Sequence, residues 1–289
     1  MDSIRYCRDK GAPPGSRAHY TLLTLDPPQR RALTALKALV AELQEIPWIQ
    51  DPGVARAKLD WWRHELQRLV AGSPQHPVTQ VLGQSGPWVA SSEALFVGLC
   101  DGVAMDLDYD VYPTLGALTG YLHRLGSNGA LLTAKALGYQ SPPAAAFAHE
   151  MGAMELLAER LGDVYRHALR GRYYIPEEDM NQFDLQPHEL RRPRGDDRTR
   201  ALFHHQGERI RAYHRRALEQ LPAEDRYGLR PLLINGRLTE AWLDEVAADG
   251  YRLLERGIAL TPLRQLWLAW HTAWREGRNH RRRPRRPAV

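Results

Sequence analysis

The sequence has few of the features that identify secreted, membrane-spanning or disulfide-stabilised proteins. It contains only two cysteines, Cys7 and Cys100, and because they have neither metal-ligand spacing nor a disulfide pattern we interpret both as reduced thiols. No run approaches about 18 consecutive apolar residues, and the N-terminus MDSIRYCRDKG lacks the apolar segment of a secretory signal. These absences predict a cytoplasmic protein.

The motifs of several enzyme classes are missing as well. We find no phosphate-binding loop, no nucleophile–base arrangement and no Cys/His zinc spacing, which disfavours NTPases, hydrolases and zinc enzymes. The acids in DLDYDVYP, at 106–113, lack the glycine and the distal glutamate of a calcium-binding loop. Strand patterns are also absent, so we expect an all-α protein.

The composition is sufficient for a large core, and charge is unevenly distributed along the chain. With 289 residues, 43% of them hydrophobic, the chain can bury the core of one large domain. The segment 278–289, RNHRRRPRRPAV, holds six arginines and no acid, so the net charge of +5 becomes −1 for the rest of the chain. We expect residues 1–277 to form a single domain. Residues 278–289 are predicted to be a disordered basic tail, and the alternative is that they contact the inner face of a membrane. No nucleic-acid partner is expected.

Apolar residues recur at helical spacing through most of the chain. Segments 29–46 and 52–71 show this spacing most clearly, and each ends at a Pro or Gly-Ser-Pro break. Further helices are predicted at 78–82, 92–105, 114–137, 143–170, 199–221, 229–234, 238–256 and 262–275. The polar insertion 177–198 is expected to lie over the end of the helical bundle. Helical spacing also indicates core packing or an amphipathic surface for Trp61, Trp62, Trp242, Trp267, Trp270 and Trp274.

The stretch 151–176, MGAMELLAERLGDVYRHALRGRYYIP, combines an acidic ladder with a basic turn. Glu155, Glu159 and Asp163 recur every four residues, which places them on one stripe of a helix. Arg170 and Arg172 follow within two turns. Such an arrangement could hold Mg²⁺ on the acids and a diphosphate between the metal and the guanidinium groups. The alternative interpretation is a solvated charged face.

Several segments, taken in order, resemble the squalene/phytoene synthase family. They are SRAHY at 16–20, LDPPQRRA at 25–32, AKLDWWR at 57–63, GSPQHPV at 72–78, MDL at 105–107, YPT at 112–114, GSNGA at 126–130 and RGRYYIP at 170–176. This resemblance covers about residues 16–275 and implies an isoprenoid-synthase helical bundle around a central apolar cavity. It also implies head-to-head joining of two prenyl diphosphates, with Mg²⁺ held by acids on two facing helices.

The same resemblance implies a set of site residues. Those matched to diphosphate-binding positions are Ser16, Arg17, Arg31, Arg170, Arg172 and Tyr174. Those matched to the cavity are Tyr121, Gly126 and Ser127. Two alternatives stay open, because Ser16 and Arg17 could be an ordinary helix cap and a surface charge, and the small residues at 126–130 could allow close helix packing.

Both metal-binding motifs of the family are altered in this chain. The first, of the Asp-Asp-x-x-Asp type, falls at Gln44, Glu45 and Trp48. Glu45 is the one candidate ligand there, with Glu42 one turn earlier. The second, of the Asp-x-x-x-Asp type, retains Asp163 but has His167 at its last position. Replacing carboxylates in this way removes both charge and the hard oxygen ligands that Mg²⁺ prefers.

Two hypotheses follow. In the first, head-to-head activity is lost or altered, and the chain keeps an isoprenoid- or lipid-binding cavity or serves as a scaffold for a protein partner. The segment LVAELQEI at 39–46 is similar to a branch that resembles respiratory complex I assembly factors. In the second, the chain is a Mg²⁺-dependent prenyltransferase of the farnesyl-diphosphate type, with Glu159 and Asp163 facing Glu42 and Glu45. We favour the first because members of both motifs are replaced.

Overall fold

Helices make up nearly all the regular structure of residues 2–139 and 141–282, which this computed structural model describes. The α-helices are α1 (Ser3–Gly11), α2 (Arg17–Leu22), α3 (Pro27–Gln44), α4 (Pro52–Val70), α5 (Pro77–Gly83), α6 (Glu93–Asp108), α7 (Leu115–Leu122), α8 (Asn128–Ala136), α9 (Pro142–Gly162), α10 (Val164–Leu169), α11 (Glu177–Gln182), α12 (Asp197–Gln220), α13 (Arg230–Ala248) and α14 (Pro262–Arg281). Shorter elements are the 3₁₀ turns η1 (Ile46–Trp48), η2 (Ala90–Ser92) and η4 (Pro187–Arg191) and the π-helical segment η3 (His123–Ser127). Within this part of the chain the only β contact is an isolated bridge, so the all-α prediction is confirmed.

Four of the long helices, α3, α4, α9 and α14, begin at a capping side chain followed by proline. Asp26 accepts a hydrogen bond from the backbone N–H of Gln29 at 2.9 Å, and Ser141 and Thr261 cap α9 and α14 in the same way. A proline in the first turn costs no hydrogen bond, since its missing N–H would have no partner there. These starts therefore follow from local sequence alone.

Between residues 229 and 256 the structure departs from the predicted helix boundaries. Segments 229–234 and 238–256 were expected to be separate helices, but α13 runs without a break from Arg230 to Ala248. Gly236, inside it, is buried, and a Cβ there would lie 2.7 Å from Nε2 of His214, so this glycine serves close packing rather than a break. The helix stops before residue 256 because Gly250 and Tyr251 have φ angles of 72° and 56°.

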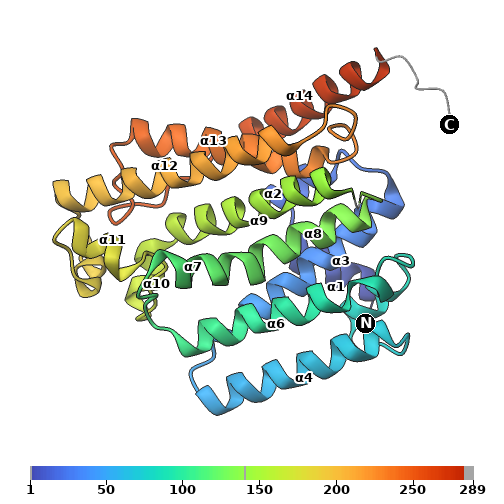
Figure 1. Ribbon diagram of the computed structural model, residues 1–289, viewed down its shortest axis with the longest axis horizontal. Helices are drawn as coiled ribbons and strands as arrows, with labels where there is room; N and C mark the ends of the chain where they lie inside the picture. Colours follow the sequence, from blue (N-terminus) through green and yellow to red (C-terminus); the bar gives the residue numbers. More distant parts are fainter. Residues whose placement is uncertain (1, 140, 283–289) are drawn as a thin grey trace.

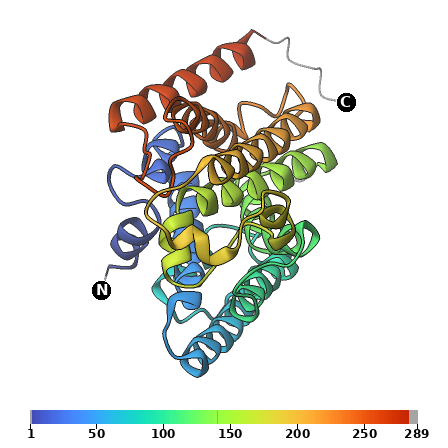
Figure 2. The same cartoon turned by 90° about the vertical axis from the view of Figure 1, so that its left-hand side faces the viewer.

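Helix α9 lies in the middle of the bundle (Figure 1). Helices α12 and α13 pack on one side of it, and α7, η3 and α8 pack on the other. The view turned by 90° shows α14 outside α13 and α4 at the opposite edge (Figure 2). As expected, the insertion at 177–198 lies at one end of the bundle, where η4 contacts α10. Because α9 is enclosed in this way, neighbouring helices contact its side chains on several sides.

Helix α14 extends four residues beyond the predicted end of the domain. Residues 278–281, expected in the disordered tail, continue this helix, and residues 283–289 lie outside the described residues. No helix among the described residues is long and apolar enough to cross a membrane.

The π-helical turn η3 and helix α9 pack backbone against backbone. A Cβ built on Gly126 would lie 2.4 Å from the carbonyl oxygen of Gly152, and one built on Gly152 would lie 2.2 Å from that of Gly126. The segment predicted as one helix at 114–137 contains the π-helical turn η3 at this contact. Gly126, one of the small residues at 126–130, therefore allows close helix packing.

This contact predicts a large effect of one added methyl group. We expect Gly152→Ala to lower the free energy of unfolding by about 2–4 kcal/mol, because the backbone of η3 would have to move away from α9. Urea denaturation measures the change. In the control variant Gly129→Ala, the new Cβ would meet only Cγ2 of Val40 at 3.8 Å, and we expect a change within about 1 kcal/mol. Equal midpoints for both variants would contradict the prediction.

Candidate functional site

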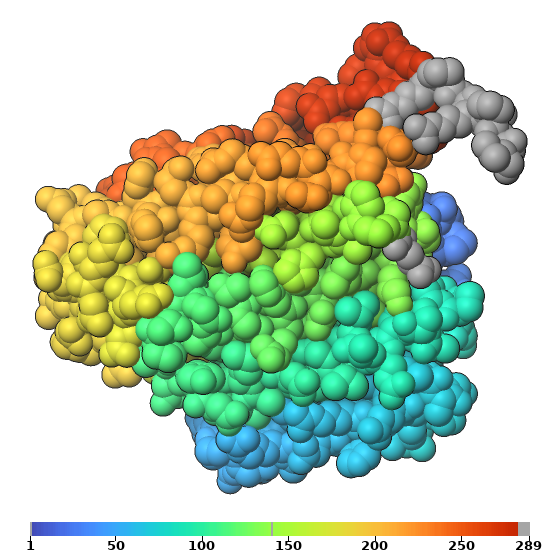
Figure 3. Space-filling view, in the orientation of Figure 1, coloured from blue at the N-terminus to red at the C-terminus, as the bar shows by residue number. Residues whose placement is uncertain are grey.

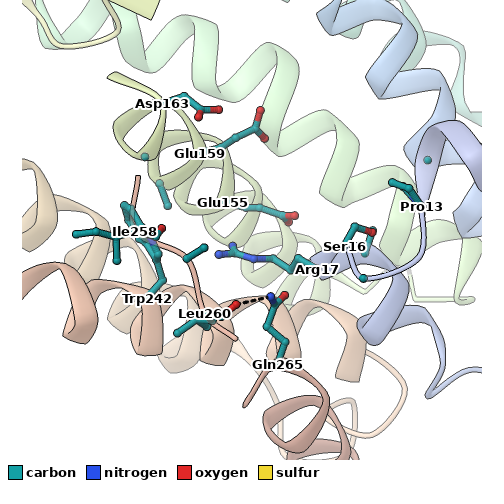
Figure 4. Close-up of a pocket in the computed structure, with 16 residues that line it drawn as sticks. Pro13, Ser16, Arg17, Glu155, Glu159, Asp163, Trp242, Ile258, Leu260 and Gln265 are labelled. Carbon is teal, nitrogen blue, oxygen red and sulfur yellow. Dashed lines mark hydrogen bonds between the residues drawn. The ribbon is translucent and has the colours of Figure 1, made fainter. Parts of the chain in front are cut away.

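The acidic ladder lines a cavity of about 510 Å³ at the C-terminal end of α9 (Figure 4). Glu155 and Glu159 project from α9, and Asp163 is the residue that ends it. Ser16 and Arg17, at the start of α2, lie across the cavity from these acids. We call this the acidic cavity. It brings together the predicted ladder and two of the six predicted diphosphate-binding residues.

Arg17 is the cation of the acidic cavity. Its guanidinium points toward the acids of α9 in Figure 4, and its Nη1 donates to Oγ1 of Thr239 at 3.0 Å. Burial lowers the pKa of Arg17, and the negative charges of Glu155 and Glu159 partly offset this effect. Ser16 is occupied as the N-cap of α2, accepting from the N–H of His19 at 3.1 Å. Arg17 is thus the residue with donors to offer an anion.

A second cavity, of about 210 Å³, lies between α3, α8 and α9. This central cavity shares Glu155 and Glu159 with the acidic cavity, and its walls include Leu36, Val40, Leu125, Gly126 and Leu156. Gly126 therefore lines a cavity in addition to packing against α9. The acids of α9 form the boundary between a polar and a largely apolar space.

Helix α3 faces the central cavity with a lysine and an amide rather than with acids. Lys37 and Gln44 line this cavity, and Nζ of Lys37 lies 3.0 Å from Oε1 of Glu155. Burial opposes ionisation of Glu155. This effect of burial is outweighed by the positive charges of Lys37 and Arg17 and by a hydrogen bond from Asn235. The pKa of Glu155 therefore lies below its usual range.

The two remaining predicted metal ligands point away from both cavities, so the expected four-carboxylate arrangement is wrong. Glu42 is buried against α1, where it accepts from the hydroxyl of Tyr6 and lies 3.2 Å from Nζ of Lys10. Glu45 lies 2.6 Å from the same lysine. The reason is rotation about the axis of α3, because positions 37, 40 and 44 face α9 while positions 42 and 45 face α1.

The last positions of the two altered motifs meet as an aromatic pair. The rings of Trp48 and His167 are stacked, with centroids 5.1 Å apart and planes 12° from parallel. Burial, together with the positive charges of Arg160 and Arg166, lowers the pKa of His167 to about 3. The imidazole is therefore neutral at pH 7. Two uncharged rings occupy the place where the resemblance implies facing carboxylates.

Arg170, Arg172 and Tyr174 lie beside the Trp48–His167 pair and not in the acidic cavity. The guanidinium carbons of Arg170 and Arg172 lie 5.2 and 5.9 Å from the ring centroid of Trp48. Arg172 also donates to the backbone carbonyl of Asp106, and the hydroxyl of Tyr174 donates to Oδ2 of Asp106 at 2.8 Å. These three predicted diphosphate-binding residues therefore lie apart from Ser16 and Arg17.

A buried polar cluster beside the aromatic pair was missed by the sequence analysis. Arg160 is only 5% exposed, and its Nε and Nη2 donate to the hydroxyl oxygen of Tyr121 at 3.0 and 2.7 Å. Asp106 is also buried, and this burial raises its pKa despite the nearby arginines. The signal for Arg160 was weak, because an arginine next to Glu159 in a charged stretch indicates a surface position.

The other predicted site residues lie elsewhere. Tyr121 belongs to this polar cluster rather than to a cavity wall, and Ser127 is buried and donates to the backbone carbonyl of His149 at 2.7 Å. Arg31 lines a separate cavity of about 340 Å³ between α1, α2 and α3, with Arg8 and Arg30. We call it the arginine cavity. None of these three residues lines the acidic or the central cavity.

The donor set does not fit the expected magnesium clamp. Among residues 2–139 and 141–282, no three His, Cys, Asp or Glu side chains gather closely enough to hold a metal ion. Glu159 pairs with Arg160 at 3.0 Å, and Asp163 pairs with Arg166. No acid comes from α3 to complete the site. We therefore derive no step through Mg²⁺ from this arrangement.

Comparison with known proteins agrees with the resemblance seen in the sequence. The family model described as squalene/phytoene synthase matches residues 13–266. The 15-cis-phytoene synthase of Synechocystis sp. is 27% identical over 287 residues, covering 93% of this chain and 85% of that protein. The presqualene diphosphate synthase of Sinorhizobium fredii is 26% identical over 181 residues, covering 61% and 64%.

Solved structures of similar fold cover nearly the whole chain. A dehydrosqualene synthase in complex with ligand has a TM-score of 0.78 at 18% identity, covering 96% of this chain and 97% of that one. The squalene synthase of Alicyclobacillus acidocaldarius has a TM-score of 0.74 at 20% identity, covering 86% and 95%. The predicted isoprenoid-synthase fold is thereby confirmed.

The stacked histidine predicts a specific pH dependence. Because the pKa of His167 falls from its ordinary 6.5 to about 3 on folding, the unfolded chain binds this proton more readily, and stability is lost as pH falls from 6.5 toward 3. Between pH 7 and pH 4.5 we expect the wild type to lose about 2–3 kcal/mol more than His167→Phe, which keeps a neutral ring. Urea denaturation at both pH values measures this, and equal losses would count against a neutral His167.

Proposed function

The chain belongs to the squalene/phytoene synthase family, whose model matches residues 13–266, and from this we propose that it binds a prenyl diphosphate or a related isoprenoid lipid with its head-to-head coupling activity lost or altered. The observation that carries the proposal is the stacked pair of Trp48 and His167. The resemblance implies metal-binding acids at both positions, and two neutral rings supply neither charge nor oxygen ligands to a metal.

The two adjoining cavities supply the parts that such a ligand needs. Arg17 offers charge-assisted hydrogen bonds to a phosphate oxygen at the polar end. The apolar walls of the central cavity, including Leu36 and Val40, suit a hydrocarbon chain. Lys37 provides a second positive charge at the boundary between the cavities. Excluding water from these walls strengthens the attraction between the arginine and the anion.

A Mg²⁺-dependent prenyltransferase is the competing hypothesis, and one observation favours it. Glu155, Glu159 and Asp163 line the same cavity, and carboxylate oxygens are the ligands that Mg²⁺ prefers. We place this hypothesis second because α3 contributes no carboxylate from its side of the cavity. A scaffold role with a protein partner stays a prediction.

The proposal predicts binding without metal. In calorimetric titrations with farnesyl diphosphate, we expect the same affinity in the presence of Mg²⁺ and of EDTA, and no release of diphosphate. Arg17→Gln should weaken binding about tenfold or more, because it removes a charge-assisted hydrogen bond. Arg31→Gln is the matched control, since Arg31 lines the separate arginine cavity, and it should bind as the wild type does. An equal effect of both substitutions, or the absence of binding, would overturn the proposal.

The competing hypothesis makes the opposite prediction. If the acids of α9 hold Mg²⁺, farnesyl diphosphate should bind only with the metal and release diphosphate, and Glu159→Ala/Asp163→Ala should abolish both. Glu150→Ala is the control, because Glu150 lies on the same helix but pairs with Arg216 at 2.9 Å outside the cavity. Metal-dependent turnover lost only in the double variant would replace our proposal with this one.

A further inference from the structure

Helix α14 carries an apolar stripe that faces solvent. Its members and exposed fractions are Leu263 at 80%, Leu266 at 42%, Trp267 at 56%, Trp270 at 57% and Trp274 at 43%. Spacings of three and four residues place all five on one side of the helix. The buried side, with Leu268 and Ala269, packs on the bundle, where α14 contacts α13 and α2. In the space-filling view α14 projects at the upper edge of the molecule (Figure 3).

The apolar surface continues from α14 onto the N-terminal helices. Leu266, Trp270 and Trp274 form a cavity of about 340 Å³ with Leu23, the residue that ends α2. Leu23 is 45% exposed and also lines the arginine cavity, together with Ile4 of α1, which is 51% exposed. We call the exposed apolar residues the tryptophan face. Its members are Ile4, Leu23, Leu263, Leu266, Trp267, Trp270 and Trp274.

The only acid of α14 points into the protein. Glu276 is 2% exposed and accepts from Arg226 at 3.1 and 3.2 Å and from Arg275 at 3.2 Å. This buried pairing fixes the rotation of α14 about its own axis. The exposed side of the helix consequently presents no carboxylate.

The surroundings of the tryptophan face are basic. The guanidinium carbon of Arg278 lies 5.4 Å from the ring centroid of Trp274, and Arg281 continues the same stripe one turn later. Arg8, Arg30 and Arg31 line the arginine cavity, which has no carboxylate among its described lining residues. In the sequence, 283–289 adds three more arginines and no acid. An apolar centre is thus bordered by cations at both ends.

We propose that the tryptophan face docks on a bilayer that contains anionic phospholipids. Trp side chains favour the membrane–water interface, where the indole body contacts acyl chains and the N–H remains hydrated. A helix with one apolar side and arginines beside it lies in the plane of that interface and gains attraction from anionic headgroups. A second copy of the chain is the poorer occupant, because pairing two such faces brings Arg278 and Arg281 of both copies together on a side of α14 that presents no carboxylate.

Vesicle binding by the full-length chain tests this proposal. We expect sedimentation with vesicles of phosphatidylcholine and phosphatidylglycerol, weak sedimentation with phosphatidylcholine alone, and tryptophan quenching by brominated lipids. Trp267→Ser/Trp270→Ser/Trp274→Ser should lower the partition coefficient by about tenfold or more. The control Val97→Ser/Leu169→Ser changes residues that are 48% and 57% exposed on other helices, and it should bind as the wild type does. Circular dichroism melts confirm that both variants fold.

Three results would overturn the proposal. The wild type could fail to sediment with anionic vesicles. The triple variant could bind as well as the wild type, which would assign membrane attraction to the basic C-terminus alone. The wild type could instead form a concentration-dependent dimer that the triple variant loses, without binding vesicles, which would assign the face to a second copy of the chain.

Discussion

The backbone contact between Gly126 and Gly152 determines where the acids of α9 lie. Because neither residue has a side chain, η3 and α9 approach until carbonyl oxygens fill the space of a Cβ. Glu155 and Glu159 follow within the next two turns, so this contact places them between the acidic and the central cavities. A side chain at either glycine would separate the two helices and widen the boundary that these acids form.

The fold and one half of the site could be predicted from the sequence, since both depend on spacing along a continuous helix. The ladder of Glu155, Glu159 and Asp163 does line one cavity, opposite Arg17. The extrapolation failed beyond Asp163, where α9 ends and α10 begins in a new direction. That break turns Arg170 and its neighbours away from the acidic stripe. A periodic pattern does not show where a helix changes course.

The other half of the site depends on an element without a sequence signal of its own. Helix α1, at Ser3–Gly11, precedes the part of the chain that resembles the family, and its Lys10 pairs with Glu42 and Glu45. Spacing within α3 could not decide which of its sides would face α9, because both sides carry polar residues. Trp48 and His167 were seen as losses of ligands. Their contact places two uncharged rings where the resemblance implies carboxylates, which would repel one another without a cation between them.

The inward position of Glu276 has a consequence for the behaviour of the protein in water. Because its pairing with Arg226 holds α14 at one angle, the helix cannot roll to hide its tryptophans when nothing covers them. The exposed apolar surface therefore persists in solution and favours self-association of the protein. Repulsion between the like net charges of neighbouring molecules opposes this association. Because salt weakens this repulsion, the solubility of the protein depends on the ionic strength.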